Sequence, residues 1–307
     1  MVTEDSAGTL SASLDELAHA IRSGSVAAGV EGLVDSLDHH RLQVSAEEWP
    51  SIVRSVVRVH PVFGLIHESP FSRRAFEKPR GYAGDAETLD LVYRALALPT
   101  DATPLGRHIG ECELESSTCR GIRSRLHILT AAIDRVADER PGARILSVAC
   151  GHLREVQRSK AVAAGRVATV IAFDQDADSL RRVAYEQPSA TPTQGSARQL
   201  VSGAARWSGL DLIYSTGLYD YLSDRFASAL TRALFEMLSS GGRLLIANLT
   251  PKAGAGYLEA CMDWWMTYRD EDGISRLADA ISVEQIASAR RFRDDTRNVV
   301  FLELTRA

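Results

Sequence analysis

The sequence predicts an α/β fold in which a mostly parallel sheet is covered by helices on both faces and follows a helical N-terminal segment. Four short apolar runs rich in branched residues indicate strands, at residues 143–149, 167–174, 210–216 and 242–249. Helical patterns separate these runs, and near-continuous apolar strands that alternate with helices are typical of a buried parallel sheet. The last segment, 289–307, has two strand-like halves around Asp294 and Asp295, which predicts an antiparallel C-terminal hairpin.

The first part of the chain is predicted to be helical. Apolar residues between about 10 and 60 recur at helical spacing, and the pattern resumes from Leu89 to Val136. Residues 60–85 interrupt it with three prolines, three glycines, several aromatics and many charges. We expect a long structured loop there, and long loops inside compact domains are often functional. The boundary between the helical segment, 1–138, and the sheet domain, 139–307, is expected at the start of the first apolar run.

The composition favours a globular protein that acts on small molecules. Hydrophobic residues make up 45% of the chain and charged residues 24%, as in ordinary globular proteins. A net charge of -5 gives no attraction to nucleic-acid phosphates or anionic lipid, so no nucleic-acid partner is expected. The cysteines form no CxxC pair, which predicts neither a disulfide framework nor a metal site. The N-terminus lacks the features of a signal peptide and no long apolar run follows, so a cytoplasmic protein without membrane insertion is expected.

The ends of the predicted strands indicate a nucleotide site, because ligands of doubly wound sheets bind at the carboxyl ends of the strands. The first strand ends at residues 149–151, where Gly151 lets a ligand approach the backbone closely. The second ends at Asp174, where a carboxylate can accept hydrogen bonds from a ribose diol. Nicotinamide dehydrogenases and S-adenosylmethionine-dependent methyltransferases both use such a carboxylate. A dinucleotide turn needs G-x-G-x-x-G, but Ala149 and Arg154 replace two of these glycines, which favours S-adenosylmethionine.

Four blocks of the sequence resemble one family. They are KPRGYAGDAETLDLVY (78–93), ILSVACGHLREV (145–156), DLIYSTGLYDYL (211–222) and CMDWWMTYRDED (261–272). Residues 143–250 with the terminal hairpin resemble class I S-adenosylmethionine-dependent methyltransferases, and the four blocks more specifically resemble the bacterial methyltransferases of 3-hydroxypalmitic acid methyl ester biosynthesis. The resemblance implies a Rossmann-like sheet with a reversed last strand and S-adenosylmethionine as the cofactor. It also implies that segment 1–138 is a lid that forms part of the acceptor pocket.

The resemblance implies a cofactor site drawn from both segments. Its candidate residues are Tyr82, Asp85, Ala149, Cys150, Gly151, Asp174, Gln175, Ser196, Ala197, Arg198, Ser215, Thr216 and Gly217. The segment 195–200 would lie near the adenine. The turn departs from the family pattern at Ser147, where an acidic residue is usual, and at Ala149 and Leu153, where glycines are usual. These departures bear on the affinity for the cofactor rather than on the fold.

Methyl transfer from a sulfonium is an in-line displacement, so the protein has to align the acceptor, the methyl carbon and the sulfur and to exclude water. A base is needed only when the acceptor must lose a proton. A carboxylate acceptor needs none, and the resemblance implies a methyl ester as the product. The expected reaction is therefore O-methylation of a small carboxylic acid.

Two sets of side chains are candidates for this chemistry. The candidate catalytic residues are Arg80, Tyr82, His152 and Tyr219. The candidate acceptor-binding residues are Tyr219, Tyr221, Trp264, Trp265, Tyr268 and Arg269. Arg80 could bind a carboxylate, and His152 could be a base for a hydroxyl or amine acceptor. The helical spacing of residues 264–269 predicts that their aromatic side chains lie near one helix face.

Most of these residues have a structural alternative. Arg80 could pair with Asp85 or a nearby glutamate and brace its loop, and Tyr82 and Asp85 could make loop-fixing hydrogen bonds. His152 could face solvent or cap a helix, and Asp220 could be a helix N-cap. The aromatic residues at 264–268 could belong to the core.

Other functions also remain open. The enzymatic alternative is N-methylation or hydroxyl O-methylation of another small metabolite, for instance in secondary metabolism. The alternative from a different class is a non-catalytic S-adenosylmethionine-binding protein. A small-molecule acceptor is expected in the enzymatic cases, and a homodimer is a further expectation. No metal is expected in the site.

Overall fold

The computed structural model describes residues 4–307, with side chains from residue 8 onward. The chain forms two compact units. Unit 1 extends to Arg120 and takes in Pro251–Trp265, and unit 2 comprises Gly121–Thr250 and Met266–Ala307. This division differs from the boundary expected at residue 138, because helix α8 (Ser117–Glu139) lies mostly in the sheet unit and a later segment returns to the helical unit.

Unit 1 is helical, as predicted for the N-terminal segment. Its helices are α1 (Glu4–Arg22), α2 (Val26–Gln43), α3 (Trp49–Ile52), the π-helical turn η1 (Val53–Val57), α4 (Pro61–Ile66), α5 (Pro70–Glu77), α6 (Ala86–Val92), α7 (Pro104–Leu114) and α14 (Ala255–Cys261). Helix α14 is buried along its whole length and packs against α2. Gly256 permits this contact, because a Cβ there would lie 2.4 Å from the carbonyl oxygen of Leu37.

The prediction of a long loop at residues 60–85 is wrong in part, because α4 and α5 lie within this range. Each helix begins with a proline, Pro61 or Pro70. Proline suits this position because its missing N–H would have no partner in the first helical turn. The side chains of His60 and Ser69 cap the two helices by accepting backbone N–H groups. The prolines therefore mark helix starts, and the residues without regular structure are the short connection 67–69 and the segment 78–85.

Unit 2 contains a seven-stranded sheet in the described residues, with the order β3-β2-β1-β4-β5-β7-β6. The strands are β1 (Ala143–Val148), β2 (Val167–Asp174), β3 (Ala190–Gln194), β4 (Leu210–Ser215), β5 (Leu238–Leu249), β6 (Ile286–Arg293) and β7 (Val299–Arg306). Strands β1 to β5 pair in parallel, whereas β7 is antiparallel to both of its neighbours. The predicted Rossmann-like class I methyltransferase sheet with its reversed last strand is confirmed.

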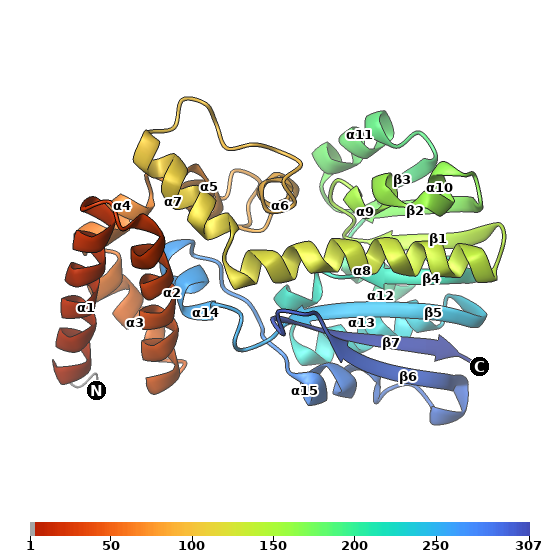
Figure 1. The fold of residues 1–307 in the computed structure, drawn as a ribbon. Helices are drawn as coiled ribbons and strands as arrows, with labels where there is room; N and C mark the ends of the chain where they lie inside the picture. Colours follow the sequence, from red (N-terminus) through yellow and green to blue (C-terminus); the bar gives the residue numbers. More distant parts are fainter. Residues whose placement is uncertain (1–3) are drawn as a thin grey trace. The chain divides into compact units, whose positions relative to one another are not determined.

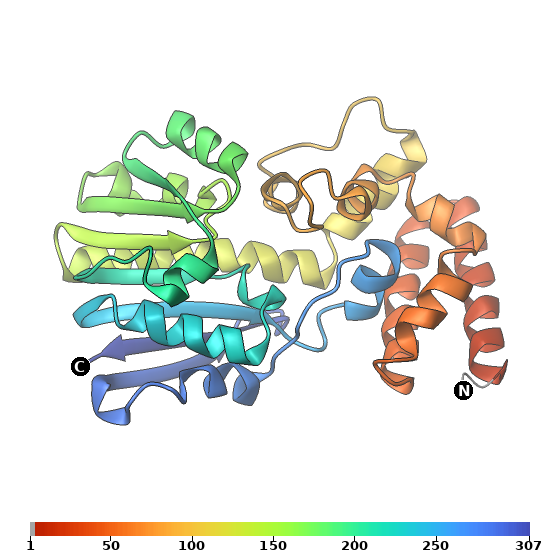
Figure 2. The ribbon, with the colours of Figure 1, turned by 180° about the vertical axis from the view of Figure 1, so that it is seen from behind.

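Helices cover both faces of this sheet. They are α8, α9 (Arg154–Arg158), α10 (Lys160–Ala163), α11 (Ala177–Glu186), α12 (Ala197–Ser202), the 3₁₀ turn η2 (Tyr219–Tyr221), α13 (Asp224–Phe235), α15 (Glu271–Ser275), η3 (Arg276–Ala278) and η4 (Val283–Gln285). Figures 1 and 2 show α8 along one face of the sheet and α13 on the opposite face. Across residues 4–307, none of the helices combines the length and apolar character needed to span a bilayer.

Strand β3 lies at one edge of the sheet, and its sequence, ATPTQ, carries no apolar run. Most of its residues are exposed because only β2 flanks it. A strand with little burial lacks the hydrophobic signal from which buried strands are predicted. This explains why the apolar pattern indicated its neighbours but not β3 itself.

The predicted C-terminal hairpin is confirmed, with Asp294 at the end of β6. The Asp294 carboxylate accepts the backbone N–H of Val299 at 2.8 Å and that of Thr296 at 2.9 Å. Strand β7 is almost fully buried, whereas β6 forms the other edge of the sheet and is rich in arginine. Charged side chains of this kind discourage pairing of an edge strand with another chain.

The prediction that residues 264–269 form a helix is wrong. Helix α14 ends at Cys261, and Asp263 adopts a left-handed conformation with φ 50°. The backbone N–H groups of Met262 and Trp264 both bond the carbonyl oxygen of Leu258, at 3.1 and 2.9 Å, which satisfies the open helix end. Residues 263–270 have no regular structure, so the aromatic residues there share no helix face.

Candidate cofactor site

The turn after β1 has a glycine-like backbone although it contains one glycine. Ala149, Gly151 and Leu153 adopt φ values of 54°, 51° and 54°. A left-handed conformation costs a residue with a side chain roughly 1–2 kcal/mol. Ala149 and Leu153 stand where the family pattern has glycines, so the departures change the strain of the turn rather than its shape. Strained backbone of this kind clusters at functional sites.

Asp174, at the end of β2, holds this turn. One of its carboxylate oxygens accepts the Gly151 N–H at 2.9 Å, and the other accepts the Asp176 N–H at 2.9 Å. Burial raises the pKa of the Asp174 carboxyl above its ordinary value, and these backbone donors act in the opposite direction. A carboxylate can accept about four hydrogen bonds, and backbone groups of Gly151, Gln175 and Asp176 use three, so acceptor capacity remains for a ribose hydroxyl. The structure thus brings together the predicted residues 149–151 and Asp174.

A hollow of about 380 Å³ lies beyond the ends of β2 and β3. It is lined by Gln175, Gln194, Gly195, Ser196 and Gln199, of which Gln175 and Ser196 are predicted site residues. A Cβ at Gly195 would lie 2.5 Å from the Phe173 ring, so only glycine fits there without a shift.

Gly195 and Gln199 belong to the segment 195–200 that was expected near the adenine, whereas sequence reasoning missed Gln194. Gln199 stands three residues after Ser196, and the two form a capping box at the start of α12. Ala197 is the first residue of α12, and Arg198 is exposed on its first turn.

The loop after β4 is fixed beside β1. The Ser215 hydroxyl donates to the carbonyl oxygen of Val148 at 3.0 Å, and Thr216 and Gly217 are half-buried. Arg125 of α8 is buried and donates to the carbonyl oxygen of Thr216. Sequence reasoning missed Arg125, although an arginine within the apolar stripe of an amphipathic helix was a usable signal.

Tyr219 does not form the expected wall of an acceptor pocket. Its side chain is fully buried in the core of unit 2, and its hydroxyl lies 3.1 Å from the Thr231 Oγ1 atom. Asp220 is not the expected helix cap, because its carboxylate accepts the Leu249 N–H at 2.7 Å and lies 3.7 Å from Arg125. Tyr221 is 40% exposed, so it remains able to meet a ligand.

Arg269 was expected at a pocket mouth, but the structure places it inside unit 2. It is 4% exposed and donates to the carbonyl oxygens of Tyr219 and Leu222, at 2.8 and 2.6 Å. It also bonds the Asn248 side chain at 2.6 Å and pairs with Asp224 at 2.8 Å. Arg269 therefore fixes the backbone of the loop after β4, and a ligand would have to displace these bonds.

The other residues of the expected aromatic group are also dispersed. Trp264 is buried in unit 1, whereas Trp265 is 37% exposed and donates from Nε1 to the Asp263 carboxylate at 2.7 Å. Tyr268 belongs to unit 2 and is half-buried. Because the segment is not helical, these aromatic side chains do not share one face and differ in burial.

Cys150 and His152 belong to the strained turn, and both are buried. His152 is buried, so the expectation that it faces solvent is wrong. Burial and the nearby Asp174 carboxylate raise the pKa of the Cys150 thiol well above its usual range. The thiol therefore stays neutral and is no nucleophile at physiological pH.

In unit 1, the predicted residues of the loop before α6 have partners within that loop and its flanking helices. Arg80 pairs with Glu87 at 2.7 Å. Asp85 is fully buried, caps α6 and pairs with Arg74 at 2.7 Å. Tyr82 is half-buried. For Arg80 and Asp85 these contacts are the loop-bracing ones expected as their structural alternative.

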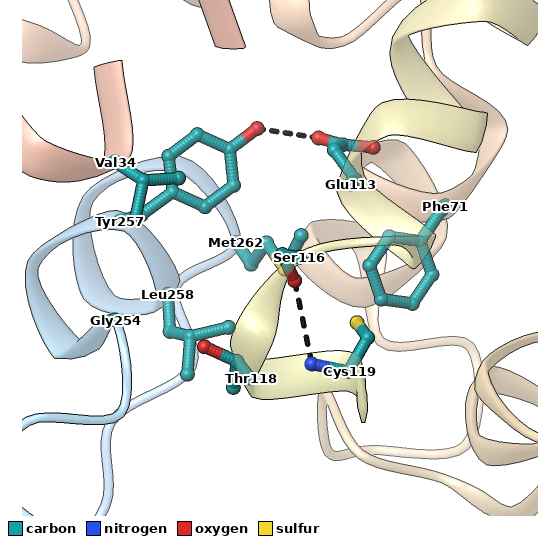
Figure 3. A pocket seen from close by; sticks show the side chains of 10 residues that line it. All are labelled: Val34, Phe71, Glu113, Ser116, Thr118, Cys119, Gly254, Tyr257, Leu258 and Met262. Atoms are coloured by element: carbon teal, nitrogen blue, oxygen red, sulfur yellow. Dashed lines mark hydrogen bonds between the residues drawn. The ribbon is translucent and has the colours of Figure 1, made fainter. Parts of the chain in front are cut away.

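Unit 1 contains a small internal cavity with room of about 20 Å³, enough for roughly one water molecule. Figure 3 shows that Glu113 meets the hydroxyl of Tyr257 at this cavity. Ser69 also donates to Glu113, at 2.5 Å, as does Ser72. Burial raises the pKa of the Glu113 carboxyl to about 7. Sequence reasoning missed Glu113, since one glutamate in an amphipathic helix gives no signal of burial.

Comparisons with known proteins agree with the fold. Residues 79–180, which include the strained turn and Asp174, match a family described as "Putative methyltransferase". A Bordetella parapertussis structure described as a "possible exported protein" has a TM-score of 0.64 and 19% identity, with 99% of each chain covered. At this identity the likeness establishes the fold alone, and the cytoplasmic location stays a prediction.

Two enzyme structures match more weakly. Magnesium protoporphyrin IX methyltransferase from Synechocystis PCC 6803, with bound S-adenosylhomocysteine, gives a TM-score of 0.47 and 14% identity over 62% of this chain and 86% of that one. The N-methyltransferase NodS from Bradyrhizobium japonicum WM9 gives a TM-score of 0.42 and 14% identity, over 60% of this chain and 95% of that one. None of the curated proteins matches the sequence.

Proposed function

We propose that the protein is an S-adenosylmethionine-dependent methyltransferase that acts on a small molecule. The observation that carries this proposal is the buried Asp174 carboxylate, which is bonded to the strained turn after β1 and lies next to the hollow at the ends of β2 and β3. The match of residues 79–180 to a methyltransferase family supports it.

The residues present fit the cofactor. Asp174 would bind the ribose diol, the backbone at Ala149–Gly151 would lie beside the methionine part, and Gln175 with Ser196 would flank the adenine. When bound, the cofactor supplies an electrophilic methyl group. The chain supplies a fixed frame, because Arg125 and Arg269 hold the carbonyl groups of the loop after β4 in place. A fixed frame favours an in-line arrangement of the reacting atoms.

For the acceptor, we propose a small carboxylic acid, which requires no base. This choice follows the resemblance of the four sequence blocks to ester-forming methyltransferases. Arg80 is the proposed cationic partner, and it would exchange its present ion pair with Glu87, which is partly exposed, for the acceptor.

A hydroxyl or amine acceptor is the alternative, and one observation favours it. Glu113 is a buried carboxyl at a cavity of unit 1, and burial raises its pKa to about 7. A carboxyl with a pKa near the working pH can take up a proton that an acceptor releases.

The cofactor site is tested by calorimetry with S-adenosylhomocysteine. We expect the wild-type protein to bind it and Asp174→Ala to bind at least about tenfold more weakly, because hydrogen bonds to a charged group are lost. Asp211→Asn is the matched control, since Asp211 starts β4 at the opposite end of the sheet, where it pairs with Arg140. Absence of wild-type binding, or equal binding by Asp174→Ala, would contradict the site.

The acceptor is tested with methyl-labelled S-adenosylmethionine and panels of carboxylic acids, phenols and amines. We expect label transfer to a carboxylic acid and its release by mild base, as for a methyl ester. Base-stable label that Glu113→Gln reduces would instead support the hydroxyl or amine alternative. Binding without transfer to any class would identify a non-catalytic binding protein.

A further inference from the structure

The turn after β1 requires an explanation, because its own sequence disfavours its conformation. Ala149 and Leu153 both hold left-handed φ values although neither is a glycine. Residues in such regions persist only when the surrounding structure over-determines them. The acidic side chain that usually stands at position 147 could contribute to this, but Ser147 occupies it.

A buried acidic side chain of another element nevertheless bonds Tyr214, the residue paired with Ser147. Glu155, in the first turn of α9, is 6% exposed. Its Oε1 atom accepts the hydroxyl of Tyr214 at 2.7 Å. Ser147 and Tyr214 are paired residues of the neighbouring strands β1 and β4, so their side chains lie on the same face of the sheet.

These contacts fix the two ends of the turn. The chain leaves the sheet after Val148 and enters α9 at Arg154, and the bond from Tyr214 to Glu155 ties the start of α9 to β4, the strand beside β1. On the β2 side, Asp174 accepts the Gly151 N–H. On the α8 side, the Thr130 hydroxyl donates to the Glu155 carbonyl oxygen at 3.2 Å. The strained residues 149–153 are thus fixed at both ends and in the middle.

We propose that Glu155, bonded by Tyr214, is a positioning residue that holds the strained turn in the shape that binds the cofactor. It supplies from α9 the buried carboxyl that the family pattern has on β1. Glu155 does not touch the cofactor itself and acts through residues 149–151. The proposal rests on the proposed function, since it assigns a means of positioning to that same site.

The decisive variant is Tyr214→Phe, which keeps the buried ring and removes only the hydroxyl that bonds Glu155. We expect calorimetry to show S-adenosylhomocysteine binding weakened about tenfold, as for a buried group that loses its hydrogen-bond partner. Thr231→Val is the matched control, because it removes a buried hydroxyl bond to Tyr219, away from the turn, and should leave the affinity unchanged.

A second substitution separates positioning from general stability. Ala149→Gly removes the cost of the left-handed conformation, so the turn should then depend less on Glu155. In the Tyr214→Phe background we expect it to restore the affinity to within about threefold of the wild type, whereas a loss of overall stability would not be repaired in this way. Wild-type protein that binds no S-adenosylhomocysteine would overturn the proposed function and this inference together. Wild-type binding with unchanged affinity in Tyr214→Phe, or no rescue by Ala149→Gly, would overturn the inference alone.

Discussion

Two single residues of this protein, Ala149 and Glu113, have conformations or surroundings that are unfavourable in free energy. Ala149 holds a conformation suited to glycine, and Glu113 is a carboxyl buried without a cationic partner among the hydrogen bonds described for it. Both features lower the stability of the isolated fold. Each yields a prediction about stability that is separate from the proposed activity.

Ala149→Gly should stabilise the protein. The substitution removes a left-handed cost of roughly 1–2 kcal/mol and adds an entropy cost of about 0.5–1 kcal/mol, so a net gain of about 1 kcal/mol is expected. Urea unfolding measures it. Ala184→Gly is the control, because Ala184 is exposed within helix α11 and the same exchange there should cost about 1 kcal/mol. A lower free energy of unfolding in Ala149→Gly would contradict the inference that Ala149 is strained.

Glu113→Gln should stabilise the protein in alkaline but not in acidic solution. The pKa of Glu113 is raised from 4.5 to about 7, so its contribution to stability is full below pH 4.5 and is lost as the pH rises through 7. The glutamine variant, which does not ionise, should match the wild type in acid and exceed it near pH 8 by up to about 3 kcal/mol.

Thermal unfolding across this pH range measures the difference between the two proteins. Glu115→Gln serves as the control, because Glu115 is exposed two residues away and pairs with Arg94. A difference between wild type and Glu113→Gln that does not change with pH would show that Glu113 is not buried as a carboxylate in alkaline solution.

At the scale of elements, helices and strands are determined by how much of their surface is buried and by what closes their ends. Strands β1, β2, β4 and β5 are buried and were visible as apolar runs, whereas the edge strand β3 was not. The ends of α4, α5 and α14 depend on caps and on left-handed residues. These features of the helix ends explain why the expected elements were wrong at residues 60–85 and 264–269.

The C-terminal hairpin offers a test of such a closure. Asp294→Ala removes two backbone hydrogen bonds in a buried turn and should lower the free energy of unfolding by about 1–3 kcal/mol. Asp295→Ala is the matched control, since Asp295 is the next residue and is exposed. Equal effects of the two substitutions in urea unfolding would argue against the turn described here.

At the scale of the whole molecule, the chain passes between its two units three times, at residues 120–121, 250–251 and 265–266. Helix α14 follows the sheet strand β5 in the sequence but is buried in unit 1, where Arg41 pairs with Glu259 at 2.6 Å. The units are therefore interwoven in sequence, and neither is a contiguous segment that can be cut free.

A fragment that begins at residue 121 should consequently fail to fold as a monodisperse protein. It would keep α14 but lose the α2 face on which this helix packs, and so would expose apolar surface. Size-exclusion chromatography and binding of a hydrophobic dye compare the fragment with the full chain. A monomeric fragment that binds no dye would show that α14 does not need unit 1.

The sequence by itself determined the α/β class, the buried strands, the terminal hairpin and the pairing of the turn at 149–151 with Asp174. These features depend on patterns that are local or repeated along the chain, namely apolar runs, helical spacing and a carboxylate at a strand end. Hydrophobic burial acts on such patterns directly, which is why they can be read in one dimension.

Only the tertiary structure decided where Tyr219, Arg269, Arg125 and Glu155 lie. The first two looked like site residues and are buried supports, while the sequence did not indicate the partners of the other two, Thr216 for Arg125 and Tyr214 for Glu155. The physical reason is that a polar side chain can be satisfied by a partner far away in sequence. Its burial and hydrogen bonds then depend on how the elements pack, which no short stretch of sequence encodes.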